Sequence, residues 1–312
     1  MHALPKREDG TLNLTELAKG KDALMPFGET EVLLYYGIVG SKLLNFLRGR
    51  ELAAKNWLPP KGGMPKILKR GSKDEPLYIE EFVDAITPEF LSLRKKHLDE
   101  ARGQLTHSQE KVWRYFVPRK LSDLLYATNN EGEGKPIDRI FFDLDRGEGV
   151  TSEYAQQVAK EFVEVMKGDL KTLGCSDPFI QWTGSSFHVL LFLKKKMPSS
   201  FYDEKLQVSA KGGLDTTAQK WVEKLKENFK VSGSHEKVRR ILSIDPSQTP
   251  SGKLARSPFS LHMKDDKTVD GVAIPLEADM LEDKGLVSEL RAYTPNKVID
   301  ELESLSKRLP VL

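Results

Sequence analysis

The second half of the sequence has a regular order of apolar segments that limits how the chain can fold. RIFFDLD (139–145), PFIQW (178–182), HVLLFL (188–193) and RRILSID (239–245) have the composition of buried strands. Two stretches with helical spacing of apolar residues, 153–173 and 216–229, lie between them. The order strand, helix, strand, strand, helix, strand predicts a split βαβ sheet with helices on one face.

The remaining segments suggest two lobes within one domain. Apolar residues at helical spacing predict an amphipathic helix over 31–47, and residues 66–80 have the pattern of a short extended pair. The loop TNNEGEGKPI at 128–137 marks the boundary between the lobes. We therefore expect an α+β domain over 1–312, with an N-terminal α/β lobe at about 1–134, a split βαβ lobe at about 135–278 and C-terminal helices at 279–312.

Aspartates end two of the predicted strands. Asp143 and Asp145 are two positions apart on a strand, so their side chains point to the same face and repel each other. A hard divalent cation, Mg²⁺ or Mn²⁺, removes this repulsion because it prefers carboxylate oxygens. Asp245 supplies a third carboxylate, and two such ions can clamp a phosphoryl displacement. Asp-x-Asp also occurs in sugar-nucleotide transferases and in surface turns, and an aspartate before proline commonly starts a turn.

Two further segments contain groups suited to phosphate. The turn Thr183-Gly184-Ser185-Ser186 precedes His188 at the start of a strand, and its backbone N–H groups and hydroxyls can hold an anion. The segment ARSPFSLH has neither helical nor alternating spacing, which predicts a specific loop. Arg256 in this segment can pair with phosphate oxygens in a bidentate manner.

Composition restricts the class of protein. The formal net charge is only +2, but basic residues cluster at 66–73, 94–96, 194–196 and 237–240, which suits a groove that follows a nucleic-acid backbone. Cys175 is the single cysteine, so neither a disulfide within the chain nor a cysteine-based zinc site is expected. No apolar run indicates a membrane helix or a secretory signal, and we expect a cytoplasmic protein that does not bind membranes.

Taken together, these motifs resemble the archaeo-eukaryotic primase superfamily. FFDLDRG resembles its first motif, TGSSFH its second and Ile244-Asp245 its third, while SPFSLH is similar to a phosphate-contacting stretch of primase small subunits. The resemblance implies a two-lobed archaeo-eukaryotic primase fold of the α+β class, with an RRM-like (split βαβ) catalytic lobe. It also implies a nucleotidyltransferase that copies a template.

A longer stretch, LLYYGIVGSKLLNFLRGRELAAKNWLPPKGGMPKILKRG, resembles the N-terminal lobe of the polymerase domain of bacterial ligase D. The resemblance implies that Asp143, Asp145 and Asp245 are catalytic and bind two divalent ions, Mn²⁺ or Mg²⁺, and that no zinc is needed. It implies nucleotide binding by Ser185, Ser186, His188, Gln248, Arg256, Ser260, His262 and Lys69. It further implies binding of a DNA 5′-phosphate by Lys19 and Lys21, although Glu31 stands where a further lysine is expected.

The resemblance favours a repair polymerase that fills gaps and DNA ends during non-homologous end joining. Its expected partners are broken or gapped DNA with a template strand, NTPs or dNTPs, a separate DNA ligase and an end-binding protein. The alternatives are a primase catalytic subunit that makes RNA primers and a non-catalytic protein that binds DNA ends. The single cysteine argues against the first, because primases commonly carry a cysteine-rich zinc module, and the three aspartates argue against the second.

Overall fold

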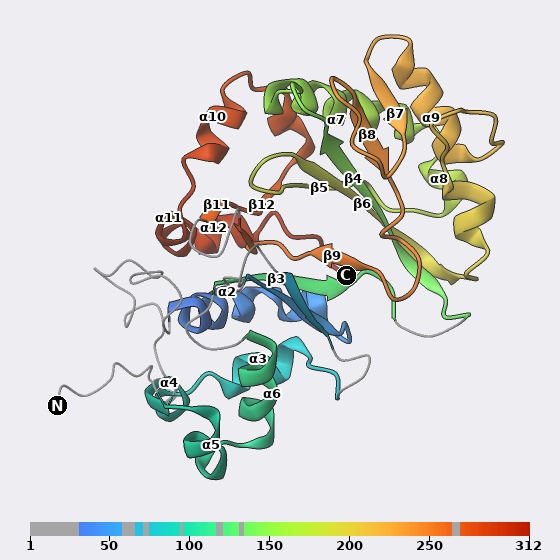
Figure 1. Ribbon diagram of the computed structural model, residues 1–312. Helices are drawn as coiled ribbons and strands as arrows, with labels where there is room; N and C mark the ends of the chain where they lie inside the picture. Colours follow the sequence, from blue (N-terminus) through green and yellow to red (C-terminus); the bar gives the residue numbers. More distant parts are fainter. Residues whose placement is uncertain are drawn as a thin grey trace. The chain divides into compact units, whose positions relative to one another are not determined.

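The computed structural model describes residues 31–57, 66–70, 75–93, 96–116, 121–130, 134–263 and 269–312. The chain forms two units that interleave along the sequence (Figure 1). Unit 1 gathers the described residues of Met1–Tyr126, Arg256–Val272 and Tyr293–Leu312, and unit 2 gathers those of Ala127–Ala255 and Ala273–Ala292. The predicted lobes are continuous in sequence, whereas these units exchange segments late in the chain.

Unit 1 combines short helices with a four-stranded sheet. In chain order its elements are α2 (Glu31–Leu47), β1 (Leu52–Trp57), β2 (Lys66–Arg70), α3 (Ile79–Ala85), α4 (Pro88–Leu93), α5 (Leu98–Ala101), η1 (Arg102–Gln104), α6 (His107–Phe116), β3 (Ser122–Ala127), β10 (Leu261–Met263), β11 (Val269–Val272), α11 (Pro295–Asp300) and α12 (Leu302–Ser306). The sheet has the order β2-β1-β3-β9, and β9 (Leu254–Arg256) spans the point where the chain passes from unit 2 to unit 1. β10 and β11 form a separate antiparallel pair.

Helix α2 confirms the helix predicted over 31–47. Val32, Tyr36, Val39, Leu43 and Phe46 follow one another at intervals of three or four residues, and all five are buried. α11 packs on the same helix from the C-terminal end of the chain. With 17 residues α2 is too short to span a bilayer, and no other helix within the described stretches is long and apolar enough to do so.

The stretch 66–80 is extended only in part. β2 pairs with β1 in antiparallel register, but α3 begins at Ile79. The Glu81 carboxylate accepts a hydrogen bond of 3.0 Å from the Tyr78 backbone N–H and so satisfies a donor at the start of this helix. Ile79 and Phe82 are buried, which anchors the helix in the core.

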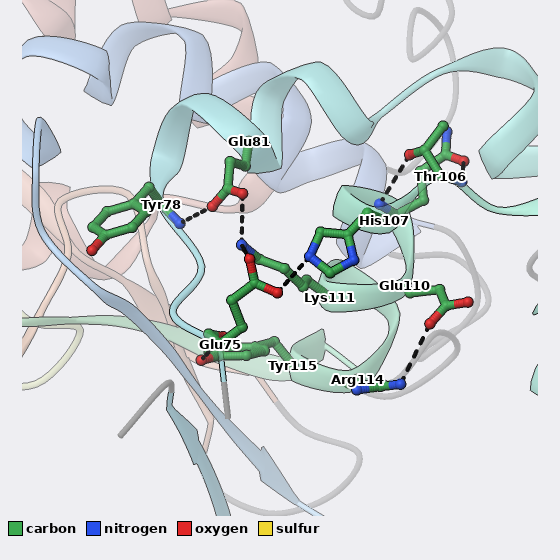
Figure 2. Close-up of polar contacts among 10 residues, drawn as sticks. Glu75, Tyr78, Glu81, Thr106, His107, Glu110, Lys111, Arg114 and Tyr115 are labelled. Carbon is green, nitrogen blue, oxygen red and sulfur yellow. Dashed lines mark hydrogen bonds and ion pairs between the residues drawn. The ribbon is translucent and has the colours of Figure 1, made fainter. Parts of the chain in front are cut away.

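A buried lysine ties α3 to α6. Lys111 of α6 places its ammonium 2.6 Å from Glu81 and 3.6 Å from Glu75, and Figure 2 shows the two carboxylates converging on it. Glu75 also contacts His107, whose hydrogen bond is the main reason that the pKa of Glu75 is lowered. Because the Lys111 side chain is only 7% exposed, its charge depends on these carboxylates for compensation.

Unit 2 is built around a six-stranded sheet with the order β12-β5-β6-β4-β8-β7. In chain order its elements are β4 (Ile137–Arg146), α7 (Ser152–Lys167), α8 (Leu170–Leu173), β5 (Phe179–Trp182), β6 (Phe187–Met197), η2 (Tyr202–Leu206), α9 (Thr217–Lys226), β7 (Val231–Gly233), β8 (Leu242–Asp245), β12 (Ile274–Leu276), η3 (Ala278–Glu282) and α10 (Leu286–Arg291).

The central strands have the predicted split βαβ arrangement. β6 lies between β4 and β5 and is antiparallel to both, and β8 is antiparallel to β4 on its other side. Two edge strands extend this core: β7 pairs with β8 in parallel, and β12 pairs with β5. The fold is therefore α+β, as the order of apolar segments predicts.

The helices α7 and α9 pack on one face of the sheet of unit 2. Ile140, Phe142 and Leu144 alternate along β4 and are buried on the side of the helices α7 and α9 (Figure 1). The Phe142 ring lies 5.1 Å from Phe162 of α7 and 6.0 Å from Trp221 of α9. The intervening residues of β4 point to the opposite face.

The helix predicted over 153–173 is divided in two. Thr151 caps α7 by accepting a 3.1 Å hydrogen bond from the Tyr154 backbone N–H. α7 ends at Lys167, and α8 follows after Asp169, whose carboxylate accepts a 2.7 Å hydrogen bond from the Trp221 indole. This contact with α9 fixes the bend between the two helices.

Candidate active site

The three predicted aspartates lie on two neighbouring strands of unit 2. Asp143 and Asp145 are two residues apart near the end of β4, so both side chains point to the face opposite the helices. Asp143 is directly opposite Asp245 in the β4–β8 register. Opposed residues on antiparallel strands have Cβ atoms about 4.5–5.5 Å apart, which makes these carboxylates neighbours.

Asp145 experiences an unfavourable electrostatic environment. Burial raises its pKa, and the negative charge of Asp143 raises it further. The Lys237 ammonium, 2.8 Å from the Asp145 carboxylate, lowers the pKa in part. Because the Lys237 side chain is 62% exposed, it supplies a cation that can leave the carboxylate.

Asp245 is held by the turn that follows it. Its two carboxylate oxygens accept hydrogen bonds from the Ser247 backbone N–H at 2.8 Å and from the Ser247 hydroxyl at 2.9 Å. These two bonds orient the carboxylate at the end of β8, and Asp245 itself is buried.

His188 lies beside Asp143 on the adjacent strand. The two residues are opposite each other in the β4–β6 register, and His188 Nε2 is 3.4 Å from the Asp143 carboxylate. The Gln181 side chain is 3.1 Å from His188 Nδ1, and the Phe141 ring packs against the imidazole at 4.7 Å. If the Gln181 amide donates to Nδ1, the proton of the neutral imidazole is on Nε2 and points toward the carboxylates.

A tight turn joins β5 to β6 and places its backbone next to His188. Gly184 has a φ of 101°, a conformation that favours glycine. The Thr183 hydroxyl accepts a 3.0 Å bond from the Ser186 N–H, and the Ser186 hydroxyl donates to the Leu144 carbonyl of β4. Ser186 therefore attaches the turn to the strand that carries Asp143 and Asp145.

The start of α7 supports the same turn. The Ser152 hydroxyl donates a 2.8 Å hydrogen bond to the Ser185 carbonyl and accepts one of 3.0 Å from Arg291. Arg291 also contacts Glu153 at 3.1 Å. These contacts hold the turn from the side opposite β4.

Gly147 brings the loop that bears Lys237 against the end of β4. The Gly147 N–H donates a 3.0 Å hydrogen bond to the Ile241 carbonyl. A Cβ atom at this position would lie 1.8 Å from the Val238 carbonyl oxygen and 2.7 Å from that of Ile241. Only glycine allows this close approach, which sets the position of Lys237 relative to Asp145.

The donor set of this face fits hard divalent cations. Three carboxylates lie on opposed or alternate strand positions, and carboxylate oxygens are the ligands that such cations prefer. As the residues are placed, no three His, Cys, Asp or Glu side chains within the described stretches converge into a metal-ligand cluster. The Asp145 carboxylate is paired with Lys237, and the Asp245 carboxylate accepts the hydrogen bond from Ser247.

In unit 1, the predicted SPFS loop is clamped by the two tyrosines of α2. The Tyr35 hydroxyl donates a 2.8 Å hydrogen bond to the carbonyl of Phe259, which has a φ of 61°. The Tyr36 hydroxyl accepts from the Leu261 N–H at 3.1 Å. Ser260 accepts a 2.9 Å hydrogen bond from the Leu124 N–H of β3 and is fully buried, so its hydroxyl holds the loop in place.

Arg256 is paired with a buried carboxylate. Its guanidinium lies 3.0 Å from Asp123 and donates a 2.6 Å hydrogen bond to the Leu261 carbonyl. Asp123 is fully buried, accepts a further bond from the Met263 N–H and lies 3.8 Å from the Lys55 ammonium. One buried anion is thus flanked by two cations, and Lys55 is a basic group at this position that the sequence motifs did not indicate.

The predicted site residues belong to both units. Unit 2 holds Asp143, Asp145, Asp245, Ser185, Ser186, His188 and Gln248, and unit 1 holds Arg256, Ser260, His262 and Lys69. Gln248 is half-buried in the turn after Asp245, His262 lies opposite Gly271 on β10, and the backbone of Lys69 pairs with Ala54 on β2. Lys19 and Lys21 lie outside the described residues. The roles of all these residues toward nucleotide and DNA stay predictions.

Several residues of the face were not predicted from sequence. Lys237 was assigned only to a basic cluster, and Gln181 and Ser247 were not singled out. Gln181 could be found only from the pairing of β5 with β6, which places it opposite His188. Ser247 could be found from Asp245-Pro246-Ser247, because an aspartate commonly bonds the backbone two residues further on.

Comparison with known proteins agrees with this architecture. Residues 29–308 match the family model described as "LigD, primase-polymerase domain". Among solved structures, the chain is similar to the polymerase domain of ligase D from Mycobacterium tuberculosis in complex with DNA. The TM-score is 0.56 at 18% sequence identity, with 90% of this chain and 93% of the other covered, which shows a shared fold. Comparison with curated protein sequences gives no match.

Proposed function

This chain belongs to the LigD primase-polymerase domain family, and from this membership we propose that it fills gaps and extends DNA ends at double-strand breaks. The family consists of DNA-directed nucleotidyltransferases that act in DNA repair and depend on metal ions. The observation that supports the proposal most is the set of three aspartates at the ends of β4 and β8, with Asp143 opposite Asp245 on one side and His188 on the other.

In the proposed reaction, the 3′-hydroxyl of a primer strand attacks the α-phosphorus of a nucleoside triphosphate. The new O–P bond forms as the bond between the α-phosphorus and its bridging oxygen breaks, pyrophosphate leaves, and the hydroxyl proton passes to solvent. Asp143, Asp145 and Asp245 would hold two divalent cations, Mn²⁺ or Mg²⁺, which when bound neutralise charge on the attacking and leaving oxygens.

The other residues of unit 2 would position the triphosphate. The backbone N–H groups of the Gly184–Ser185 turn can donate to phosphate oxygens, because Ser186 and Ser152 hold the turn from both sides. His188 would donate from Nε2 to the same group, with its orientation fixed by Gln181. Gln248 would contact the nucleotide from the turn after Asp245.

Unit 1 would contribute basic groups. Arg256, His262 and Lys69 are proposed to contact the nucleotide or the template, and Lys19 and Lys21 the 5′-phosphate at a break. Arg256 and Lys55 lie beside the same buried carboxylate, Asp123, so two basic side chains are present at this position and would attract phosphate. DNA is the proposed macromolecular partner, together with a separate ligase and an end-binding protein.

The proposal is tested by primer extension on a gapped duplex with Mn²⁺, with and without a 5′-phosphate on the downstream strand. We expect extension that the phosphate stimulates. Extension at the same rate with and without the 5′-phosphate would support a primase-like role instead. Binding of the duplex without extension would indicate an end-binding protein.

Asp143→Ala is the decisive variant for the carboxylate assignment. Nucleotide addition is expected to fall by at least about 1,000-fold, because the loss of one charged site group typically removes several kcal/mol of transition-state stabilisation. DNA binding measured by fluorescence anisotropy is expected to change little. Asp138→Asn, a change on the same strand outside the group, serves as the control, and a wild-type extension rate in Asp143→Ala would disprove the assignment.

A further inference from the structure

An open pocket of about 680 Å³ lies in unit 2, at the end of β4 away from the three aspartates. Ile137, the first residue of β4, forms one wall. The rest comes mainly from the loop after β6, with Ser199 and Ser200, from the start of η2, with Tyr202 and Asp203, and from Ser251 in the loop after β8. The volume is within the range of about 300–1,000 Å³ that is usual for small-molecule sites.

The loop between Asp245 and the pocket is firmly attached to the sheet. Thr249 accepts a hydrogen bond of 2.9 Å from the Phe141 N–H and donates one of 3.1 Å to the Phe141 carbonyl. The Thr249 carbonyl in turn accepts a 2.6 Å bond from Asn129. Ser251 donates to the Lys135 carbonyl at 3.3 Å. The pocket wall is therefore a continuation of the strand that ends in Asp245.

Tyr202 links the pocket to the carboxylates electrostatically. Burial raises the pKa of its phenol to about 12, and the charge of Asp245 contributes to the rise. The phenol therefore stays protonated at neutral pH and can donate a hydrogen bond. An aromatic ring with a fixed donor is present in the wall of the pocket.

The lining chemistry suits an uncharged ring and sugar rather than a phosphate. Three serine hydroxyls and one phenol can exchange hydrogen bonds with a ligand, and the Tyr202 ring offers a surface for stacking. Asp203 would repel an anion, and among the described residues that line the pocket none is basic. Basic residues precede the pocket instead: Lys194, Lys195 and Lys196 are exposed near the end of β6.

We propose that this pocket binds one nucleoside unit of the DNA strand held at the active site, with its base stacked on Tyr202 and its sugar near the serines. The proposal rests on the proposed polymerase function. Ile137 and Asp143 are six residues apart on β4, or about 20 Å at 3.3 Å per residue. At 3.4 Å per nucleotide this length is an upper bound that places the pocket within roughly six nucleotides of the reacting end.

An abasic scan would test the proposal by binding alone. A fluorescein-labelled primer–template is prepared with a single abasic site, which is moved one nucleotide at a time along each strand. For the wild-type protein we expect one position, within roughly six nucleotides of the reacting end, at which affinity falls by roughly 5- to 150-fold, the range for the loss of one base–aromatic stack. The same scan with Tyr202→Ala should show no such position.

Two further variants keep the result interpretable. Ser200→Trp fills the pocket from an exposed backbone position and should also remove the effect of the abasic site, whereas Tyr154→Ala, a half-buried tyrosine on α7 outside the pocket, should leave it unchanged. Thermal melting checks that each variant is folded. If Tyr202→Ala unfolds, Ser200→Trp decides the outcome.

The proposal would be overturned if no position is sensitive in the wild type or if the sensitivity persists in both pocket variants. Displacement of the labelled DNA by free thymidine at micromolar concentration would also overturn it, because the pocket would then serve a free nucleoside. A protein that binds the primer–template but adds no nucleotide would contradict the proposed polymerase function, while the scan would still report on the pocket.

Discussion

Asp145 is a residue whose local environment favours the neutral side chain. Its raised pKa means that the ionised form is less stable in the folded protein than in the unfolded chain. The contribution of this carboxyl to stability is therefore most favourable below its ordinary pKa and is lost as the pH rises through the raised value. At neutral pH the ionised carboxylate weakens the folded state when no metal is added.

Asp145→Asn should therefore raise the melting temperature at neutral pH in the presence of a chelator, by a few degrees for about 1 kcal/mol in a protein of this size. The gain should shrink as the pH falls toward 4. Mn²⁺ should stabilise the wild type more than the variant, because binding to the folded state alone adds to stability. Differential scanning calorimetry at several pH values measures this, with Asp138→Asn as the control. An unchanged or lower melting temperature at pH 7 would contradict the electrostatic interpretation.

At the scale of single residues, the sequence was sufficient to find the carboxylates but not their partners. Alternation along a strand places Asp143 and Asp145 on one face without knowledge of the fold. The contacts of Asp145 with Lys237 and of His188 with Gln181 depend on which loop and which strand lie next to them. The strand register and the path of the loop, which only the three-dimensional structure shows, supply that information.

At the scale of elements, the end of β4 and the loop before β8 approach so closely that there is no room for a side chain at Gly147. Gly147→Ala would place a methyl group 1.8 Å from a backbone oxygen, so one of the two segments must move. We expect a loss of about 1–3 kcal/mol, the usual cost of overpacking. Nucleotide addition should fall as well, because the loop carries Lys237.

Gly168→Ala is the matched control. Gly168 follows α7 with helical backbone angles, and no atom would lie within 4 Å of an added Cβ. This change should be neutral or stabilise by about 0.4–1 kcal/mol. Thermal melting and primer extension on both variants measure the difference. Equal melting temperatures for the two variants would show that the loop can move to accommodate the methyl group without a loss of stability.

The order of elements was predictable, but their interruptions were not. Buried apolar runs identified β4, β5, β6 and β8, and helical spacing identified α2, α7 and α9. The break between α7 and α8 depends on the Asp169–Trp221 hydrogen bond, which joins residues distant in sequence. The start of α3 at Ile79 likewise depends on a side chain, Glu81, that lies beyond the stretch predicted to be extended.

At the scale of the whole molecule, the chain passes between the two units four times, after residues 126, 255, 272 and 292. Unit 1 is therefore completed by its last helices, α11 and α12. Val298, Leu302 and Leu305 are buried there, and Glu303 forms an exposed ion pair with Lys42 of α2 at 2.6 Å.

A chain that ends at residue 292 should retain the sheet of unit 2 but lose stability in unit 1. Three buried aliphatic side chains contribute at least about 1.5 kcal/mol each, so the loss should exceed roughly 4 kcal/mol. Limited proteolysis with mass spectrometry should show new early cuts in residues 31–126. A chain that ends at residue 309 removes only Pro310, Val311 and Leu312 and is the control. Identical cleavage patterns for the two chains would contradict this role of the C-terminal helices.

The packing of α11 on α2 also bears on how the protein is made. A ribosome synthesises α2 long before α11, so the elements from β1 to α10 must also be made before the two helices can meet. During translation the apolar surface of α2 lacks this cover, while the strands from β4 to β8 can already pair with one another. Unit 1 therefore completes its structure later than the central sheet of unit 2, and in that interval the exposed apolar surface of α2 can associate with other nascent chains.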